Sequence, residues 1–69
     1  MITLTEEMVI SKGKNFIKFN YSDQYEYCIE KNDGTLYAIQ YNKLTDCDHI
    51  ISLDTIDQSS ISLAKKHLS

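Results

Sequence analysis

The chain has 69 residues with 10 acidic and 7 basic side chains, a formal net charge of −3, which argues against a basic surface that binds nucleic acid by neutralising phosphates. No apolar run exceeds four residues, so we expect neither a membrane partner nor a secretory signal, and one domain over residues 1–69. The two isolated cysteines, Cys28 and Cys47, suggest a reducing cytoplasm, and the absence of Arg beside frequent Ile, Lys, Asn and Tyr suggests an AT-rich genome.

The N-terminal segment predicts a first strand that pairs with the second through a four-residue loop, Lys12 to Asn15. This loop sets Ile10 opposite Ile17 and Met8 opposite Phe19. Glu6 and Glu7 interrupt the alternation that begins near residue 2. Residues 2–5 are therefore expected as a separate short edge extension or as a bulged continuation of the first strand.

Alternation with a period of two organises residues 16–41 and predicts antiparallel strands with one face in water. The large odd-numbered residues are Ile17, Phe19, Tyr21, Tyr25, Tyr27, Ile29, Tyr37, Ile39 and Tyr41. A three-residue loop at 22–24 keeps this set on one face. It pairs Phe19 with Tyr27 and Ile17 with Ile29.

The next turn has two candidate registers. A three-residue loop with Gly34 in the left-handed conformation pairs Ile29 with Tyr37 and Tyr27 with Ile39. A two-residue Asp-Gly turn instead sets Ile29 opposite Ala38 and mixes polar with apolar residues on both faces. The sequence therefore predicts the three-residue loop.

The last third predicts a helix that covers the aromatic face of the sheet. Thr55 and Gln58 have the spacing of a capping box, and the apolar residues that follow fall on one side of a helix over residues 55–68. Residues 49–53 are expected as a fifth strand or as an extended lead into the helix. The predicted fold is α+β, a four- or five-stranded antiparallel meander covered on one face by a C-terminal amphipathic helix.

Asp46, Cys47, Asp48 and His49 form the densest group of possible metal ligands, and His67 could join them. They lack the paired Cys or His spacing of a zinc site, which favours a solvated loop. No nucleophile, base and orienting group are recognisable together, and both glycines are assigned to hairpin turns. We therefore expect no enzyme activity, metal or cofactor.

The leading functional hypothesis is a small non-enzymatic module that binds a protein partner, as an accessory or inhibitory factor of a phage or mobile element. Its expected contacts are an apolar patch on the even-numbered sheet face, made by Cys28, Leu36 and Ala38 with Val9 and Phe16, and acidic residues around it. The candidate partner-binding residues are Leu36, Glu26, Glu30, Asp46 and Asp48. The same surface could mediate self-association as a homodimer.

Two alternatives use other features. The five tyrosines could form a platform for a small ligand or single-stranded nucleic acid, although cross-strand pairing beneath the helix is the favoured role and the acidic balance makes nucleic acid unlikely. The chain could also be a structural subunit of a larger assembly.

Overall fold

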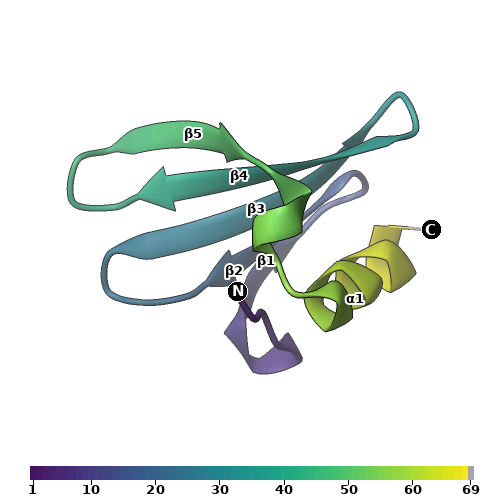
Figure 1. Ribbon diagram of the computed structural model, residues 1–69, viewed down its shortest axis with the longest axis horizontal. Helices are drawn as coiled ribbons and strands as arrows, with labels where there is room; N and C mark the ends of the chain where they lie inside the picture. The colour runs from purple at the N-terminus through teal and green to yellow at the C-terminus, as the bar shows by residue number, and fades with distance from the viewer. Residues whose placement is uncertain (69) are drawn as a thin grey trace.

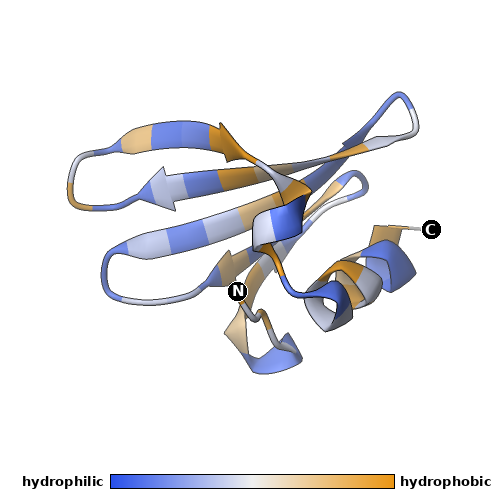
Figure 2. Ribbon diagram, viewed as in Figure 1, coloured by the Kyte–Doolittle hydropathy of each residue, from blue (hydrophilic) through white to orange (hydrophobic). Residues whose placement is uncertain are grey.

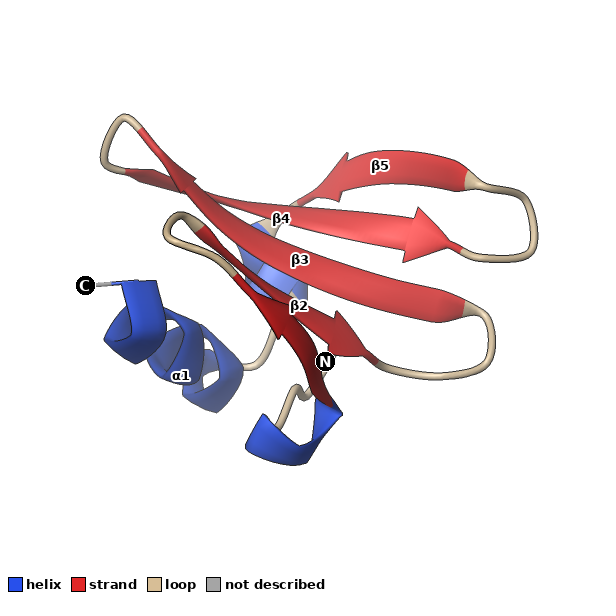
Figure 3. Ribbon diagram, turned by 180° about the vertical axis from the view of Figure 1, so that it is seen from behind, coloured by secondary structure: helices blue, strands red, loops and turns tan. Residues whose placement is uncertain are grey.

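The computed structural model describes residues 1–68 and shows a five-stranded antiparallel sheet with a helix against one face (Figure 1). The strands lie side by side in chain order, as Figure 3 also shows from behind. Their bounds are β1 (Val9–Lys12), β2 (Phe16–Asn20), β3 (Tyr25–Asn32), β4 (Thr35–Asn42) and β5 (Cys47–Ile51), and helix α1 spans Gln58–Leu68. The α+β meander with a C-terminal helix predicted from the sequence is confirmed. The fifth strand spans residues 47–51 rather than 49–53, so Cys47, Asp48 and His49 lie in a strand and not in the expected loop.

The pairing of β2 with β3 is the predicted one. Phe19 lies opposite Tyr27 and Ile17 opposite Ile29, and all four side chains are buried on the face that α1 covers. Figure 2 shows the alternating hydropathy along the strands that produces this one-sided burial. The rest of the buried apolar core comes from the N-terminal segment, β4 and the C-terminal third: Leu4, Ala38, Ile56, Ile61, Ala64 and Leu68.

The predicted register between β3 and β4 is wrong. A two-residue turn places Ile29 opposite Ala38 and Tyr27 opposite Gln40. Asp33 and Gly34 have φ values of 53° and 77°, the two positive values of a type I′ turn, whose twist matches that of the strands. The Gln40 Nε2 group donates a hydrogen bond to the Tyr27 hydroxyl at 2.9 Å, so this polar side chain is satisfied on the covered face.

This register places every side chain of β4 on the sheet face opposite to the predicted one. Ala38 is 1% exposed within the core, and Leu36 packs against the core. Tyr37 and Ile39 consequently lie on the opposite face of the sheet, together with Tyr41.

The predicted pairing of β1 is also wrong. Val9 lies opposite Phe19 and Lys12 opposite Ile17, with a bulge between Val9 and Ser11, and Ile10 is 54% exposed. Met8 lies outside β1, in a short 3-10 helix, Glu6–Met8. The bulge shifts the strand by one residue, which the apolar pattern around residues 8–10 does not reveal.

The N-terminal residues bind the C-terminal third rather than extending β1. Ile2 forms an isolated parallel bridge with Ile56. The buried Ser60 hydroxyl accepts a hydrogen bond from the Leu4 backbone N–H at 2.6 Å and donates one to the Leu4 carbonyl at 3.1 Å. These contacts fasten the first residues of the chain to the start of α1.

Helix α1 begins later than the capping-box spacing predicts. Thr55 ends a short 3-10 helix, Leu53–Thr55, and the bridge from Ile2 holds Ile56 in an extended conformation. Asp57 caps α1 instead: its carboxylate accepts from the Ser59 backbone N–H at 3.2 Å. Among residues 1–68, none of the helices has the length and apolar character needed to cross a membrane.

Candidate partner-binding face

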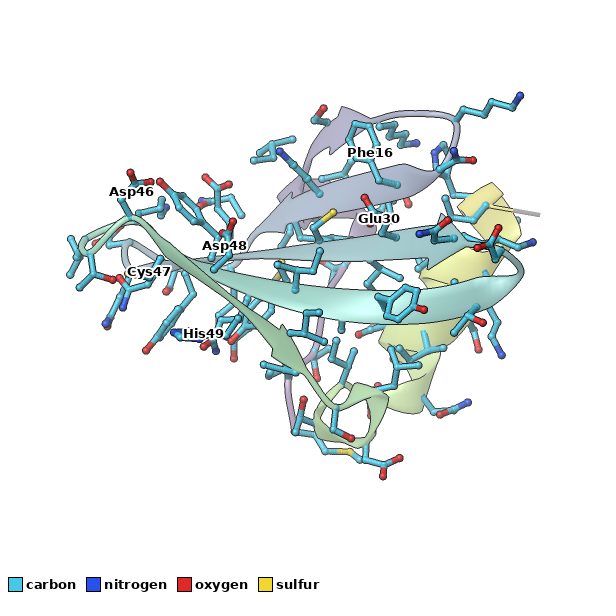
Figure 4. The ribbon with its side chains drawn as sticks, turned by 90° about the horizontal axis from the view of Figure 1, so that it is seen from above. Phe16, Glu30, Asp46, Cys47, Asp48 and His49 are labelled. Carbon is cyan, nitrogen blue, oxygen red and sulfur yellow. The ribbon has the colours of Figure 1, made fainter. Side chains whose placement is uncertain are left out.

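The sheet face opposite α1, called the open face here, has no described element packed on it (Figures 1 and 4). The strand registers assign to it Phe16, Lys18, Glu26, Cys28, Glu30, Tyr37, Ile39, Tyr41, Asp48 and Ile50. Figure 4 views the sheet from this side. Asp46 and Asp48 lie at the end of the sheet away from the helix, and Phe16 and Glu30 lie nearer to it.

An apolar row crosses the centre of the open face. Cys28 lies directly opposite Ile39, which lies directly opposite Ile50 on the edge strand β5. Cys28 and Ile39 are half-buried, whereas Ile50 is 74% exposed. The row is therefore increasingly exposed toward β5.

A concavity of about 390 Å³ lies over Cys28 and Ile39, and Ile50 is outside its lining. Four carboxylates line it, and Lys18 is the one cation among the described residues that do so. The Lys18 ammonium lies 5.8 Å from the centre of the Phe16 ring. The acidic residues are Glu26 and Glu30 from β3, Asp48 from β5 and Asp46 from the loop before β5.

Tyr41 joins the β4 strand to the acidic loop. Its hydroxyl donates a hydrogen bond to the Asp46 carboxylate at 2.7 Å. This bond raises the pKa of Tyr41, with smaller contributions from desolvation and from nearby carboxylates. Asp46 has a φ of 55°, so the loop holds a residue in the left-handed region at the point where the bond forms.

Cys28 occupies the floor of the concavity. Burial raises the pKa of its thiol, and the negative charge of Glu30 acts in the same direction. A thiol with a raised pKa is a poor nucleophile at neutral pH. The concavity therefore offers shape and negative charge rather than an activated nucleophile.

Four of the five sequence-predicted contact residues line one concavity. Glu26, Glu30, Asp46 and Asp48 come together there, although they belong to β3, β5 and the loop between β4 and β5. The assignment of Leu36 to this face is wrong, because the two-residue turn places Leu36 on the covered side.

Because the predicted register of β4 was wrong, some residues of the open face were not recognised from the sequence. Tyr37 and Ile39 were assigned to the covered face by their odd numbers. No pattern in the sequence marked Ile50 as a contact residue. The Asp-Gly pair at 33–34 was the available signal, since that pair is strongly preferred in two-residue hairpin turns.

The tyrosines divide between the two faces. Tyr21, Tyr25 and Tyr27 cluster together, with the Tyr21 and Tyr27 rings edge-to-face at 5.3 Å between centroids. Tyr37 and Tyr41 lie on the open face. A single tyrosine platform is therefore not formed, and the two open-face tyrosines stand among carboxylates that would repel phosphates.

The part of the chain that the structure describes contains no group of three or more His, Cys, Asp or Glu side chains arranged to hold a metal ion. A second concavity, of about 400 Å³, lies between α1 and the N-terminal region. It combines both charge signs, and there Lys12 forms a salt bridge with Glu6 at 3.4 Å. Of these two concavities among the described residues, the one on the open face joins an apolar centre to charge of predominantly one sign.

Comparison of the chain with protein-family models, curated proteins and solved structures finds no match in any of the three.

Proposed function

We propose that this protein is a non-enzymatic binding module that occupies a positively charged protein partner through the open face. The observation that carries the proposal is a concavity lined by Cys28, Ile39, four carboxylates and one cation, with the exposed Ile50 opposite Ile39 on β5. An apolar centre with a charged rim is the usual anatomy of a protein interface. The excess of carboxylates selects a basic partner and accelerates its approach.

A second copy of the chain is a poorer occupant of the open face. Two-fold pairing brings the same surface of both copies together, so the acidic clusters would approach each other across the interface. Like charges placed together at an interface cost several kcal/mol. We therefore favour a different, basic protein over the homodimer that the sequence also allowed.

The cellular setting of the proposal is a reducing cytoplasm. Cys28 and Cys47 both carry free thiols. Binding that blocks a basic surface of the partner would make the protein an accessory or inhibitory factor. The absence of Arg beside frequent Ile, Lys, Asn and Tyr suggests an AT-rich genome and favours a phage or mobile element as its source.

Site-directed photo-cross-linking in cells of the natural host tests the proposal. A benzophenone amino acid would replace Tyr37 on the open face or, in the matched control, Ser62, which is exposed on α1. We expect an adduct with a basic protein from position 37 and not from position 62. The same adducts from both positions, or none from position 37, would overturn the proposal.

Charge neutralisation adds a second criterion for the same adduct. Changing Glu26, Glu30 and Asp48 to their amides should slow association with the captured partner about tenfold at low salt. The control changes three exposed acidic residues elsewhere, Glu7, Asp23 and Asp54, which alters the net charge equally. Equal slowing by both triple variants would show that the open face has no specific role.

A further inference from the structure

The edge strand β5 presents free backbone hydrogen-bonding groups beside the open face. Asn32 and Thr35 flank the two-residue turn and therefore form a hydrogen-bonded pair, as the residues next to such a turn do. Alternation along β4 then directs the backbone groups of Ala38, Gln40 and Asn42 toward β5. Their partners on β5 are Ile51, His49 and Cys47.

The other two residues of β5, Asp48 and Ile50, therefore direct their backbone N–H and C=O groups away from the sheet. No hydrogen bond from another described residue reaches these groups. The bond from the Lys31 N–H to the Asn15 carbonyl at 2.8 Å supports the alternation, because it places the backbone of Lys31 toward β2. β5 thus has a free edge two residues long in which both side chains lie on the open face.

The edge formed by β1 is better protected than the edge formed by β5. β1 has four residues, a bulge between Val9 and Ser11, and Lys12 at its end, which are common devices against edge-to-edge pairing. β5 pairs with β4 over all five residues without a bulge. It also exposes 74% of the β-branched side chain of Ile50. A regular edge with an exposed apolar residue is a template for another strand.

We propose that the basic partner adds an extended segment antiparallel to β5, with an apolar residue opposite Ile50 and a Lys or Arg opposite Asp48. This inference rests on the proposed function and names how the partner binds. In an antiparallel pair the segment reads, from its N-terminus, apolar, any residue, basic. Backbone hydrogen bonds to the edge supply affinity, and the alternate side chains over the open face supply selectivity.

Charge favours such a segment over a second copy of β5. Antiparallel pairing of two β5 strands about His49 places each Asp48 opposite an Ile50, so neither side chain meets a complementary one. Pairing about Asp48 sets two carboxylates directly opposite each other, which is destabilising. Pairing about Ile50 sets two isoleucines opposite each other but places each Asp48 opposite a Ser52, again without a cation. A foreign segment with a basic residue at the second position satisfies both positions of the edge.

A peptide, acetyl-Thr-Thr-Ile-Thr-Arg-Thr-Thr-amide, tests the proposal with the full chain labelled with nitrogen-15. We expect saturable shifts at Asp48 and Ile50 and at least tenfold slower hydrogen exchange of their amides. A composition-matched peptide with Ile and Arg interchanged should bind at least threefold more weakly. Equal affinity of the two peptides, or shifts located elsewhere, would overturn the proposal.

Backbone methylation separates strand addition from simple charge attraction. In the proposed pairing the N–H groups of the peptide Ile and Arg face β5, whereas that of the central Thr faces water. N-methylation of Ile should abolish binding, and N-methylation of the central Thr should leave it nearly unchanged. The same loss from both modifications would exclude this register.

Variants of the protein complete the test. Asp48→Lys should weaken the peptide about three- to tenfold, because it replaces an exposed ion pair with a repulsion, and a peptide with Glu in place of Arg should regain the loss. Ile50→Pro removes one edge donor at a position that tolerates proline, and it should weaken binding without unfolding the sheet. Failure of the charge exchange to restore affinity would contradict the pairing of Asp48 with the basic residue.

The outcome distinguishes this inference from the proposed function. If the peptides do not bind while position 37 still cross-links a basic protein, the partner docks on the open face without strand addition. Concentration-dependent dimerisation of the chain alone, with slowed exchange at Asp48 and Ile50, would assign the edge to a second copy and overturn the inference.

Discussion

Both faces of the sheet carry large apolar residues, and they differ in what covers those residues. On the covered face Phe19 and Ile29 have 0% exposure beneath α1 and the N-terminal segment. On the open face Phe16 and Ile39 are half-buried, and Ile50 is largely exposed. Apolar content alone therefore does not identify a core, because the residues of the covered face are buried together whereas those of the open face keep part of their surface in water.

The largest expected effect contrasts the two phenylalanines of β2. Phe19→Ala removes a fully buried ring and should lower the free energy of unfolding by about 3–5 kcal/mol. Phe16→Ala, three positions earlier on the open face, should cost about 1 kcal/mol. Urea denaturation monitored by circular dichroism measures both. Similar losses would mean that the open face belongs to the core.

The second prediction tests which face Ala38 occupies. Ala38 is 1% exposed and lies opposite Ile29, so Ala38→Leu should overpack the core and cost about 1–3 kcal/mol. Tyr37→Leu, on the open face, should change stability by about 0.5 kcal/mol or less. A stable Ala38→Leu variant beside a destabilised Tyr37→Leu variant would restore the three-residue loop and reverse the assignment of the faces.

The third prediction concerns the turn that sets this register. Gly34 has a φ of 77°, where a side chain is strained, so Gly34→Val should cost about 1–2 kcal/mol. Asp33→Gly, at the neighbouring position with a φ of 53°, should be neutral or stabilising because glycine adopts that conformation readily. Thermal unfolding compares the two variants. A lower melting temperature for Asp33→Gly than for Gly34→Val would contradict the type I′ turn.

The sequence predicted the β2–β3 hairpin correctly because both faces of that pair alternate without conflict. A three-residue loop at 22–24 places Phe19 opposite Tyr27, and both are buried on the covered face. The predicted register of the β3–β4 hairpin was wrong because of Gln40, since the alternation pattern excludes a polar residue from the covered face. Gln40 is stable there because it donates a hydrogen bond to Tyr27, and that bond depends on a tertiary arrangement that no sequence pattern contains.

The candidate site shows the same limit. The four acidic candidates were chosen for their charge and not for the register of β4, and the structure brings them together in one concavity. The choice of Leu36 depended on that register, and a one-residue slip moves a strand residue to the other face. The start of α1 was missed because the bridge between Ile2 and Ile56 joins residues far apart in the sequence and holds the chain extended where the capping-box pattern predicted helix.

The smallest expected effect is a difference in alkylation rate between a thiol on the open face and one outside it. Burial raises the pKa of Cys28, whereas Cys47 is exposed at the start of β5. Because the thiolate is the reactive form, iodoacetamide at pH 8 should modify Cys47 several-fold faster than Cys28. The raised pKa favours the neutral thiol of Cys28 in the folded state, so the difference between the two alkylation rates should narrow as the pH rises through the pKa of Cys28. Mass spectrometry of the alkylated peptides measures both rates, with urea-unfolded protein as the control in which they become similar.

A bound partner that covers the open face should lower the alkylation rate of Cys28 further, whereas a partner on the helix side should leave the ratio of the two alkylation rates unchanged. Faster modification of Cys28 than of Cys47 in the folded protein would show that the floor of the concavity is more accessible than the structure indicates.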